Sequence, residues 1–155
     1  MFEWLTGSQN PAPNALDEAY LLRLRRHVGA DAMGELIDDG VLELSGKLDH
    51  LAEQASSDDI KHIASVCHDI AGAAGNLGLT AMTRAAVESN RMALSDTPPS
   101  AGELVAHVIS CRAPAEDALA AFRADQNAPG TASDAQDDSI AAPAPEHATT
   151  PADAT

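Results

Sequence analysis

The sequence has few positive charges and few aromatic residues. Its 155 residues include 9 Lys and Arg against 24 Asp and Glu, which gives a formal net charge of −15, and aromatic residues make up 3%. Nucleic acids and anionic membrane surfaces both attract basic patches. The acidic balance therefore argues against either of them as a partner, and its simplest consequence is solubility.

Cysteine and long hydrophobic runs are also scarce. Cys67 and Cys111 are the only cysteines, too few for a disulfide framework or for a zinc site with four cysteine ligands. No stretch approaches the roughly 20 apolar residues that span a bilayer, and the first residues lack the basic and apolar regions of a signal peptide. We therefore expect a soluble, cytoplasmic protein with free thiols.

No segment alternates apolar and polar residues as a β-strand does, whereas several segments have helical spacing. The sequence predicts an all-α fold, an antiparallel four-helix bundle with an extra N-terminal helix capping one end. We expect a flexible segment at 1–13, the bundle at 14–125 and a disordered tail rich in Ala, Pro and Asp at 126–155, because this tail has too few apolar residues to offset the entropy of ordering it.

Capping residues, glycines and prolines predict where the helices begin and end. Asn14 or Asp17 would cap the first helix and Gly29 would end it, while Ser56, Ser57 and Asp58 form a cap cluster before the third. Pro114 should kink or split the last helix. The predicted helices span about 14–28, 31–55, 59–74, 80–94 and 100–125.

The segment from Cys67 to Gly78, CHDIAGAAGNLG, is the most informative part of the chain. At about 100° per residue, one stripe of the helix carries His68 among mostly small residues, and the neighbouring stripe is typical of a core. A glycine inside a helix costs roughly 1 kcal/mol relative to alanine, and close approach of another surface is a reason to accept that cost. The first stripe holds Lys61, Ala64, Ser65, His68, Gly72 and Gly75, and the core stripe holds Ile63, Cys67, Ile70 and Ala74.

This pattern resembles the histidine-containing phosphotransfer (HPt) domain. That family has a small or apolar residue, the phosphoryl-accepting histidine, any residue, an aliphatic residue, Lys, Gly, and then small residues up to a Leu-Gly pair. The resemblance extends from about Leu16 to about Phe122 and departs from the family at Ala71, where a Lys is usual. The matching residues are Cys67, His68, Ile70, Gly72, Ala73, Ala74, Leu77 and Gly78.

The resemblance implies a phosphorelay intermediate in which His68 accepts and donates a phosphoryl group. It implies a carrier rather than a stand-alone enzyme, and a response-regulator receiver domain or a hybrid histidine kinase as the partner. We expect no cofactor on this chain, because in the family Mg²⁺ is held by the receiver. Imidazole suits the role since its reference pKa of about 6.5 leaves a ring nitrogen unprotonated near neutrality. We expect the protein to be a monomer.

Two groups of residues are predicted to support His68. The partner would dock over Gly72, Gly75, Ala64, Ala71 and Lys61. The missing Lys leaves a need for positive charge beside the phosphate, and Arg84, on the helix that folds back after the Leu-Gly turn, is the candidate to supply it. Lys61 is about 10 Å from His68 by helix rise, which is far for direct contact.

A second function remains open. The chain could be a helical-bundle binding module that sequesters a receiver domain or a histidine kinase without carrying phosphate, and the missing Lys at Ala71 favours that alternative. No metal site is expected, because the remaining histidines lack ligand spacing and are interpreted as surface residues. These are His27, His50, His62, His107 and His147.

Overall fold

The computed structural model describes residues 15–128, which form six α-helices and one short 3-10 helix and contain no β-strand. The predicted N-terminal segment 1–13 and nearly all of the predicted tail lie outside the described residues. The prediction of an all-α bundle is confirmed. The helices are α1 (Glu18–Val28), α2 (Ala30–Glu53), η2 (Gln54–Ser56), α3 (Ile60–Asn76), α4 (Thr80–Ala93), α5 (Ala101–Ile109) and α6 (Arg112–Asn127).

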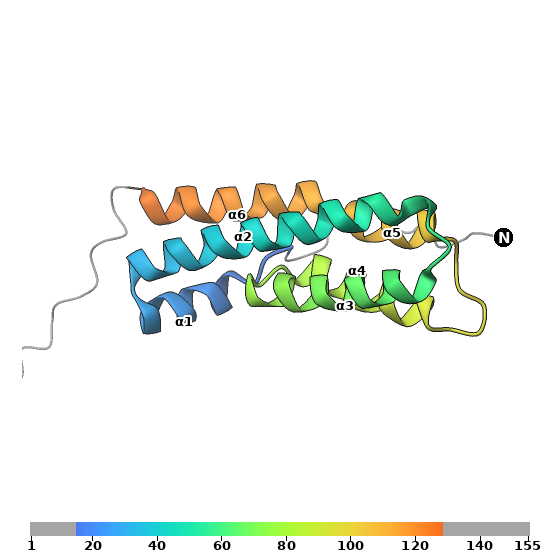
Figure 1. Cartoon of the computed structure of the whole chain (residues 1–155). Coiled ribbons are helices and arrows are strands. Elements are labelled where there is room, and N and C mark those ends of the chain that lie inside the picture. Colours follow the sequence, from blue (N-terminus) through green and yellow to red (C-terminus); the bar gives the residue numbers. More distant parts are fainter. Residues whose placement is uncertain (1–14, 129–155) are drawn as a thin grey trace, which may run out of the picture.

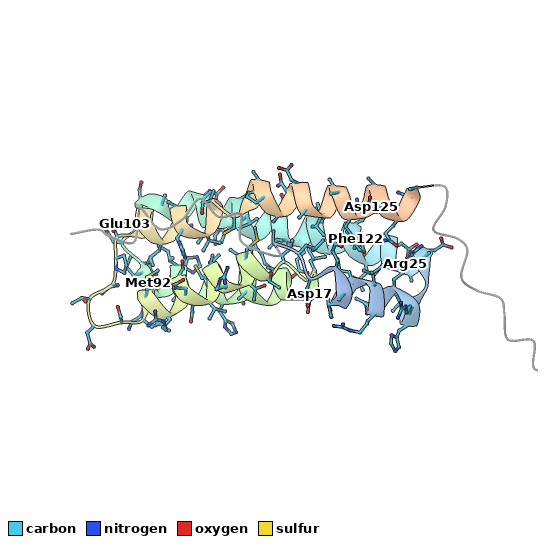
Figure 2. All side chains as sticks on the ribbon, turned by 180° about the vertical axis from the view of Figure 1, so that it is seen from behind. Asp17, Arg25, Met92, Glu103, Phe122 and Asp125 are labelled. Atoms are coloured by element: carbon cyan, nitrogen blue, oxygen red, sulfur yellow. The ribbon has the colours of Figure 1, made fainter. Side chains whose placement is uncertain are left out.

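Helix α2 runs the length of the molecule, with α5 and α6 following one another beside it (Figure 1). The antiparallel pair of α3 and α4 covers one half of α2, and α1 continues this layer under the other half (Figure 1). The backbone N–H of Asp17 donates to the carbonyl of Gly78 at 2.7 Å, so α1 starts at the turn of the α3–α4 hairpin. At its far end α1 reaches α6, where Arg25 donates to the Gln126 side chain and Phe122 lies nearby (Figure 2).

Side-chain caps fix where three of the helices begin. Asp17 accepts from the Tyr20 N–H, as one of the two predicted caps for the first helix. The third helix is capped by Asp59, one residue beyond the predicted cluster, and a Ser100–Glu103 capping box starts α5. Each cap satisfies a backbone donor that the first turn of a helix leaves without a partner.

The last predicted helix, which contains Pro114, is divided into the two helices α5 and α6. Helix α5 ends at Ile109, α6 begins at Arg112, and Pro114 lies in the first turn of α6. Proline is tolerated there because the first-turn N–H groups have no intrahelical partner. The segment is split rather than kinked within one continuous helix.

The core is centred on α3. The predicted core stripe is confirmed, since Ile63, Cys67, Ile70 and Ala74 are all 0% exposed. Helix α3 packs most extensively against α4 and also contacts α2 and α5. This three-sided packing holds α3 rigidly and leaves one narrow face of it in solvent.

The Leu-Gly pair that ends the motif is required by the fold. Leu77 is 1% exposed and Gly78 adopts a φ of 68°, a left-handed conformation that favours glycine. A Cβ on Gly78 would meet the Tyr20 ring at 3.2 Å and the Asp17 carbonyl oxygen at 3.3 Å. This turn therefore sets both the α3–α4 hairpin and the position of α1.

Candidate functional site

His68 lies on the exposed face of α3, near the middle of the helix. Its neighbours Cys67 and Ile70 are fully buried, so the helix is anchored on the opposite side. Within the described part of the chain, no hydrogen bond or ion pair holds the imidazole of His68. The ring is thus presented to solvent by a rigid support and is available for reaction.

The exposed surface of α3 beyond His68 has no projecting side chains at two positions, because these are glycines. Gly72 and Gly75 are both exposed. A Cβ added at Gly72 would have no atom within 4 Å, and one at Gly75 would have only the Thr83 hydroxyl, at 3.9 Å. Another molecule can therefore approach the backbone of α3 within one to two turns of the imidazole.

Two contacts fix the register of α4 against α3. The Asn90 side-chain amide donates to the Ala64 carbonyl at 2.7 Å, and Gly75 lies beside Thr83. For antiparallel helices with equal rise, these contacts place His68 level with Val87 and Glu88. Our sequence interpretation placed Arg84 and Glu88 near this level; Glu88 agrees with the structure, whereas Arg84 lies about one turn away.

Two exposed apolar side chains lie on α4 and its C-cap, one level with His68 and the other at the far end of the hairpin from the glycines. Val87 is 54% exposed and Leu94 is 63% exposed, and helical spacing puts both on the side of α4 that carries Thr83 and faces α3. The sequence analysis did not single out these two residues. Counting outward from the Leu77–Gly78 turn would have found them, because that turn sets the hairpin register.

Two of the predicted docking residues are buried. Ala64 is 3% exposed and Ala71 is 9% exposed, so neither offers appreciable surface to a partner. Helix α4 covers this side of α3, as the Asn90 hydrogen bond to Ala64 shows. The prediction failed because it treated α3 as half-buried, whereas α3 has three neighbours. Lys61, Gly72 and Gly75 do lie on the exposed face.

The side chain of Arg84 is directed away from His68. It lines a shallow depression with Ala118 of α6 and with Leu16, and its charge helps to lower the pKa of Cys111, which burial raises. Arg84 therefore faces α6. Lys61 lies on the exposed stripe of α3 that carries His68. The exposed Arg91 lies on the same stripe of α4 as Arg84, level with the turn of α3 before His68.

The α3–α4 hairpin is locally basic in an acidic chain. Its two helices carry Lys61, Arg84 and Arg91 against Asp69 and Glu88. None of these three cations forms an ion pair with the described part of the chain. Unpaired positive charge on the exposed surface of the hairpin, at Lys61 and Arg91, would favour an anionic ligand or an acidic partner surface.

The thiol beside His68 does not compete with it as a nucleophile. Cys67 is fully buried, and burial raises its pKa to about 11. The thiol is therefore protonated near neutrality, and only the thiolate is an effective nucleophile. His68 is the reactive group that this turn of α3 exposes.

Among residues 15–128, no three His, Cys, Asp or Glu side chains are grouped so that they could hold a metal ion. In the same part of the chain, no helix has the length and apolar character needed to cross a membrane.

Comparison with known proteins identifies the family. The model of the Hpt domain matches residues 35–125, which is more than half of the chain and includes all of α3 to α5. Searches of curated proteins and of solved structures found no match. With the exposed histidine at its motif position on the third helix of a helical bundle, the chain belongs to the Hpt domain family.

Proposed function

We propose that His68 is the phosphoryl acceptor and donor of a phosphorelay. Hpt domains are phosphotransfer carriers of two-component signalling that interact with receiver domains and histidine kinases, and family membership supports this role in general terms. The observation that carries the specific assignment is the exposure of His68 on a helix whose opposite face is fully buried. No other histidine of the described chain occupies the motif position.

In the proposed reaction, an unprotonated nitrogen of His68 attacks the phosphorus of an aspartyl phosphate on a receiver domain. An N–P bond forms, the P–O bond to the aspartate breaks, and the aspartate leaves as a free carboxylate. The ring keeps its other N–H, and the reverse reaction returns the phosphoryl group. Phosphoryl transfer depends mainly on positioning and charge stabilisation, so an exposed, rigidly held imidazole is most of what a carrier must supply.

The partner would supply the rest, including Mg²⁺ and a lysine on the receiver domain. We propose that its active-site loops approach over Gly72 and Gly75, where no side chain intervenes. Val87, level with His68, would give an apolar contact near the imidazole, and Leu94 would give another at the far end of the hairpin, since exposed apolar side chains favour association. Lys61 and Arg91 would attract an acidic partner surface.

The alternative is a binding module that sequesters a receiver or a kinase without carrying phosphate. One observation favours it: Ala71, where the family usually has a Lys, is nearly buried and brings no charge to the site. In this alternative the same face binds the partner, but His68 is not phosphorylated. The two functions differ in covalent phosphate and not in binding.

The test is phosphoryl transfer from receiver domains charged with labelled phosphate. We expect the wild-type protein to take up label that is lost in acid and retained in alkali, as phosphohistidine is. The His68→Gln variant should take up none. Its unfolding free energy should change by no more than about 0.5 kcal/mol, because His68 is exposed and makes no contact that the substitution would break.

His62→Gln is the matched control, since it makes the same change at an exposed position of the same helix. It should accept phosphate at the wild-type rate. If His68→Gln still accepts phosphate, another residue carries the chemistry. If the wild-type protein binds a receiver but takes up no label from a panel of them, the sequestering module is the better description.

A further inference from the structure

Two histidines from different helices meet where α2 is followed by α3. His50 lies in the last turn of α2 and His62 in the first turn of α3. Their Nε2 atoms are 3.1 Å apart, and the rings are nearly perpendicular, at 79°. Both side chains are exposed. Twelve residues separate the two in the sequence, so the packing of α2 on α3 creates this pair.

The carboxylate of Glu53 lies near the ring nitrogen of His50 that does not face His62. Its Oε2 atom lies 3.7 Å from Nδ1 of His50, so the carboxylate favours a proton on Nδ1. The lone pair of His50 is then on Nε2, the atom that faces His62. In this arrangement Nε2 of His62 donates the hydrogen bond and the two facing nitrogens share one proton. A cation that accepts two lone pairs can replace that proton.

We propose that His50 and His62 form a binding site for a divalent transition-metal ion of the zinc, copper or nickel class. Imidazole suits these metals, whereas Mg²⁺ and Ca²⁺ prefer oxygen ligands. Two Zn–N bonds of about 2.05 Å with the nitrogens 3.1 Å apart enclose an angle of about 98°, between the octahedral and tetrahedral values. The distance between the nitrogens therefore already suits a bound metal.

The environment of His50 matches a recurring feature of metal sites. A metal-binding histidine commonly donates its other N–H to a carboxylate, which orients the ring and makes the ligand more basic. Glu53 places a carboxylate oxygen 3.7 Å from Nδ1 of His50, which is an ionic contact and longer than a hydrogen bond. No third His, Cys, Asp or Glu of the described residues joins the pair, so water would complete the coordination. The ion would connect α2 to α3 across the short helix η2.

This site is separate from His68. His62 precedes His68 by six residues, about 9 Å along the helix axis, and helical spacing turns it toward α2, whereas His68 lies nearer α4. Binding of metal at His50 and His62 therefore does not require His68. The proposal is also independent of the proposed phosphotransfer.

Zinc chloride titrated into the untagged full chain tests the proposal, with isothermal calorimetry for affinity and histidine NMR signals for location. We expect one Zn²⁺ per chain and shifts confined to the ring signals of His50 and His62. His50→Asn and His62→Asn should each weaken binding at least tenfold. Glu53→Gln should weaken it by about tenfold, as loss of a carboxylate partner does at other sites.

Two variants serve as controls for the titration. His27→Asn removes an exposed histidine on α1 whose Nδ1 is near the Arg23 carbonyl, and His68→Gln removes the proposed phosphoryl acceptor. Both should bind Zn²⁺ with wild-type affinity. The proposal is overturned if 1 mM Zn²⁺ gives no binding, if the His50 and His62 variants retain wild-type affinity, or if His27→Asn loses affinity as they do. Circular dichroism of each variant establishes that a loss of binding does not reflect unfolding.

Discussion

Substitution of Gly72 by alanine should stabilise the protein and slow phosphotransfer. Glycine within a helix costs about 0.8–1.0 kcal/mol relative to alanine. At Gly72 the new Cβ meets no atom within 4 Å, so no clash offsets the gain. We expect the unfolding free energy to rise by about 0.8–1.0 kcal/mol, which for a domain of this size raises the melting temperature by about 4 °C.

The functional effect should have the opposite sign. Gly72 is one turn beyond His68 on the exposed face, where the proposed partner must come close. A misplacement of 1 Å at a reacting centre can cost roughly 100-fold in rate. We therefore expect Gly72→Ala to slow transfer measurably and Gly72→Leu to slow it at least tenfold. Stability and transfer rate would then change in opposite directions.

Gly46→Ala is the matched control. Gly46 also lies within a long helix, is exposed, and has no atom within 4 Å of an added Cβ, but it is on α2 and outside the α3–α4 face. It should gain similar stability without loss of transfer. The assays are chemical denaturation and transfer from a phosphorylated receiver followed in time. Transfer by Gly72→Leu at the wild-type rate would refute docking over Gly72, and an equal loss in Gly46→Ala would show that added helix stability itself impairs transfer.

Three further predictions concern charge, packing and pH. Ala71→Lys should lengthen the lifetime of the phosphorylated form and Arg91→Ala should shorten it, since a cation near the phosphate makes a charge-assisted contact. Unchanged lifetimes in both variants would mean that the partner supplies all of the positive charge beside the phosphate. Gly40→Ala should destabilise the protein by about 1–2 kcal/mol in denaturant unfolding, because its Cβ would lie 2.7 Å from the buried side chain of Leu77; a stability gain would refute this. Burial raises the pKa of the Cys67 thiol to about 11, above its ordinary value of 9.0. The contribution of the buried, protonated thiol to the free energy of unfolding is therefore complete below pH 9 and is lost as pH rises toward 11. Between pH 9 and pH 11 the Cys67→Ala variant should therefore lose roughly 1–3 kcal/mol less stability than the wild type. Identical pH profiles of unfolding free energy for the two proteins would contradict the raised pKa of Cys67.

The sequence predicted the features of the fold that depend on local chemistry. Asp17 as a cap, Gly29 as a helix end and Pro114 as a break each follow from what one residue can do with its own backbone. The core stripe through Ile63 and Cys67 followed from helical periodicity, which needs no knowledge of the neighbouring helices. His68 was identified by its motif, and its exposure by its offset from that stripe.

The sequence did not predict features that depend on contacts between helices. The burial of Ala64 and Ala71 arises because α4 covers one side of α3, and one helix's periodicity does not show how many neighbours it has. The direction of the Arg84 side chain was not predicted, because it depends on how α4 lies beside α6. The His50–His62 pair was missed for the same reason, since its two members have no ligand spacing within either helix.

The glycines of the motif have different roles, which the sequence alone does not separate. Gly78 is required by the fold, because its φ of 68° and the closeness of Tyr20 leave no room for a side chain. Gly72 has neither constraint, so an alanine would fit there and stabilise the helix. Folding therefore gives no reason for glycine at Gly72, as it gives none at Gly46 of α2. At Gly72 the proposed approach of a partner would supply a reason, because this glycine lies one turn beyond His68 on the exposed face of α3, whereas Gly46 lies on α2.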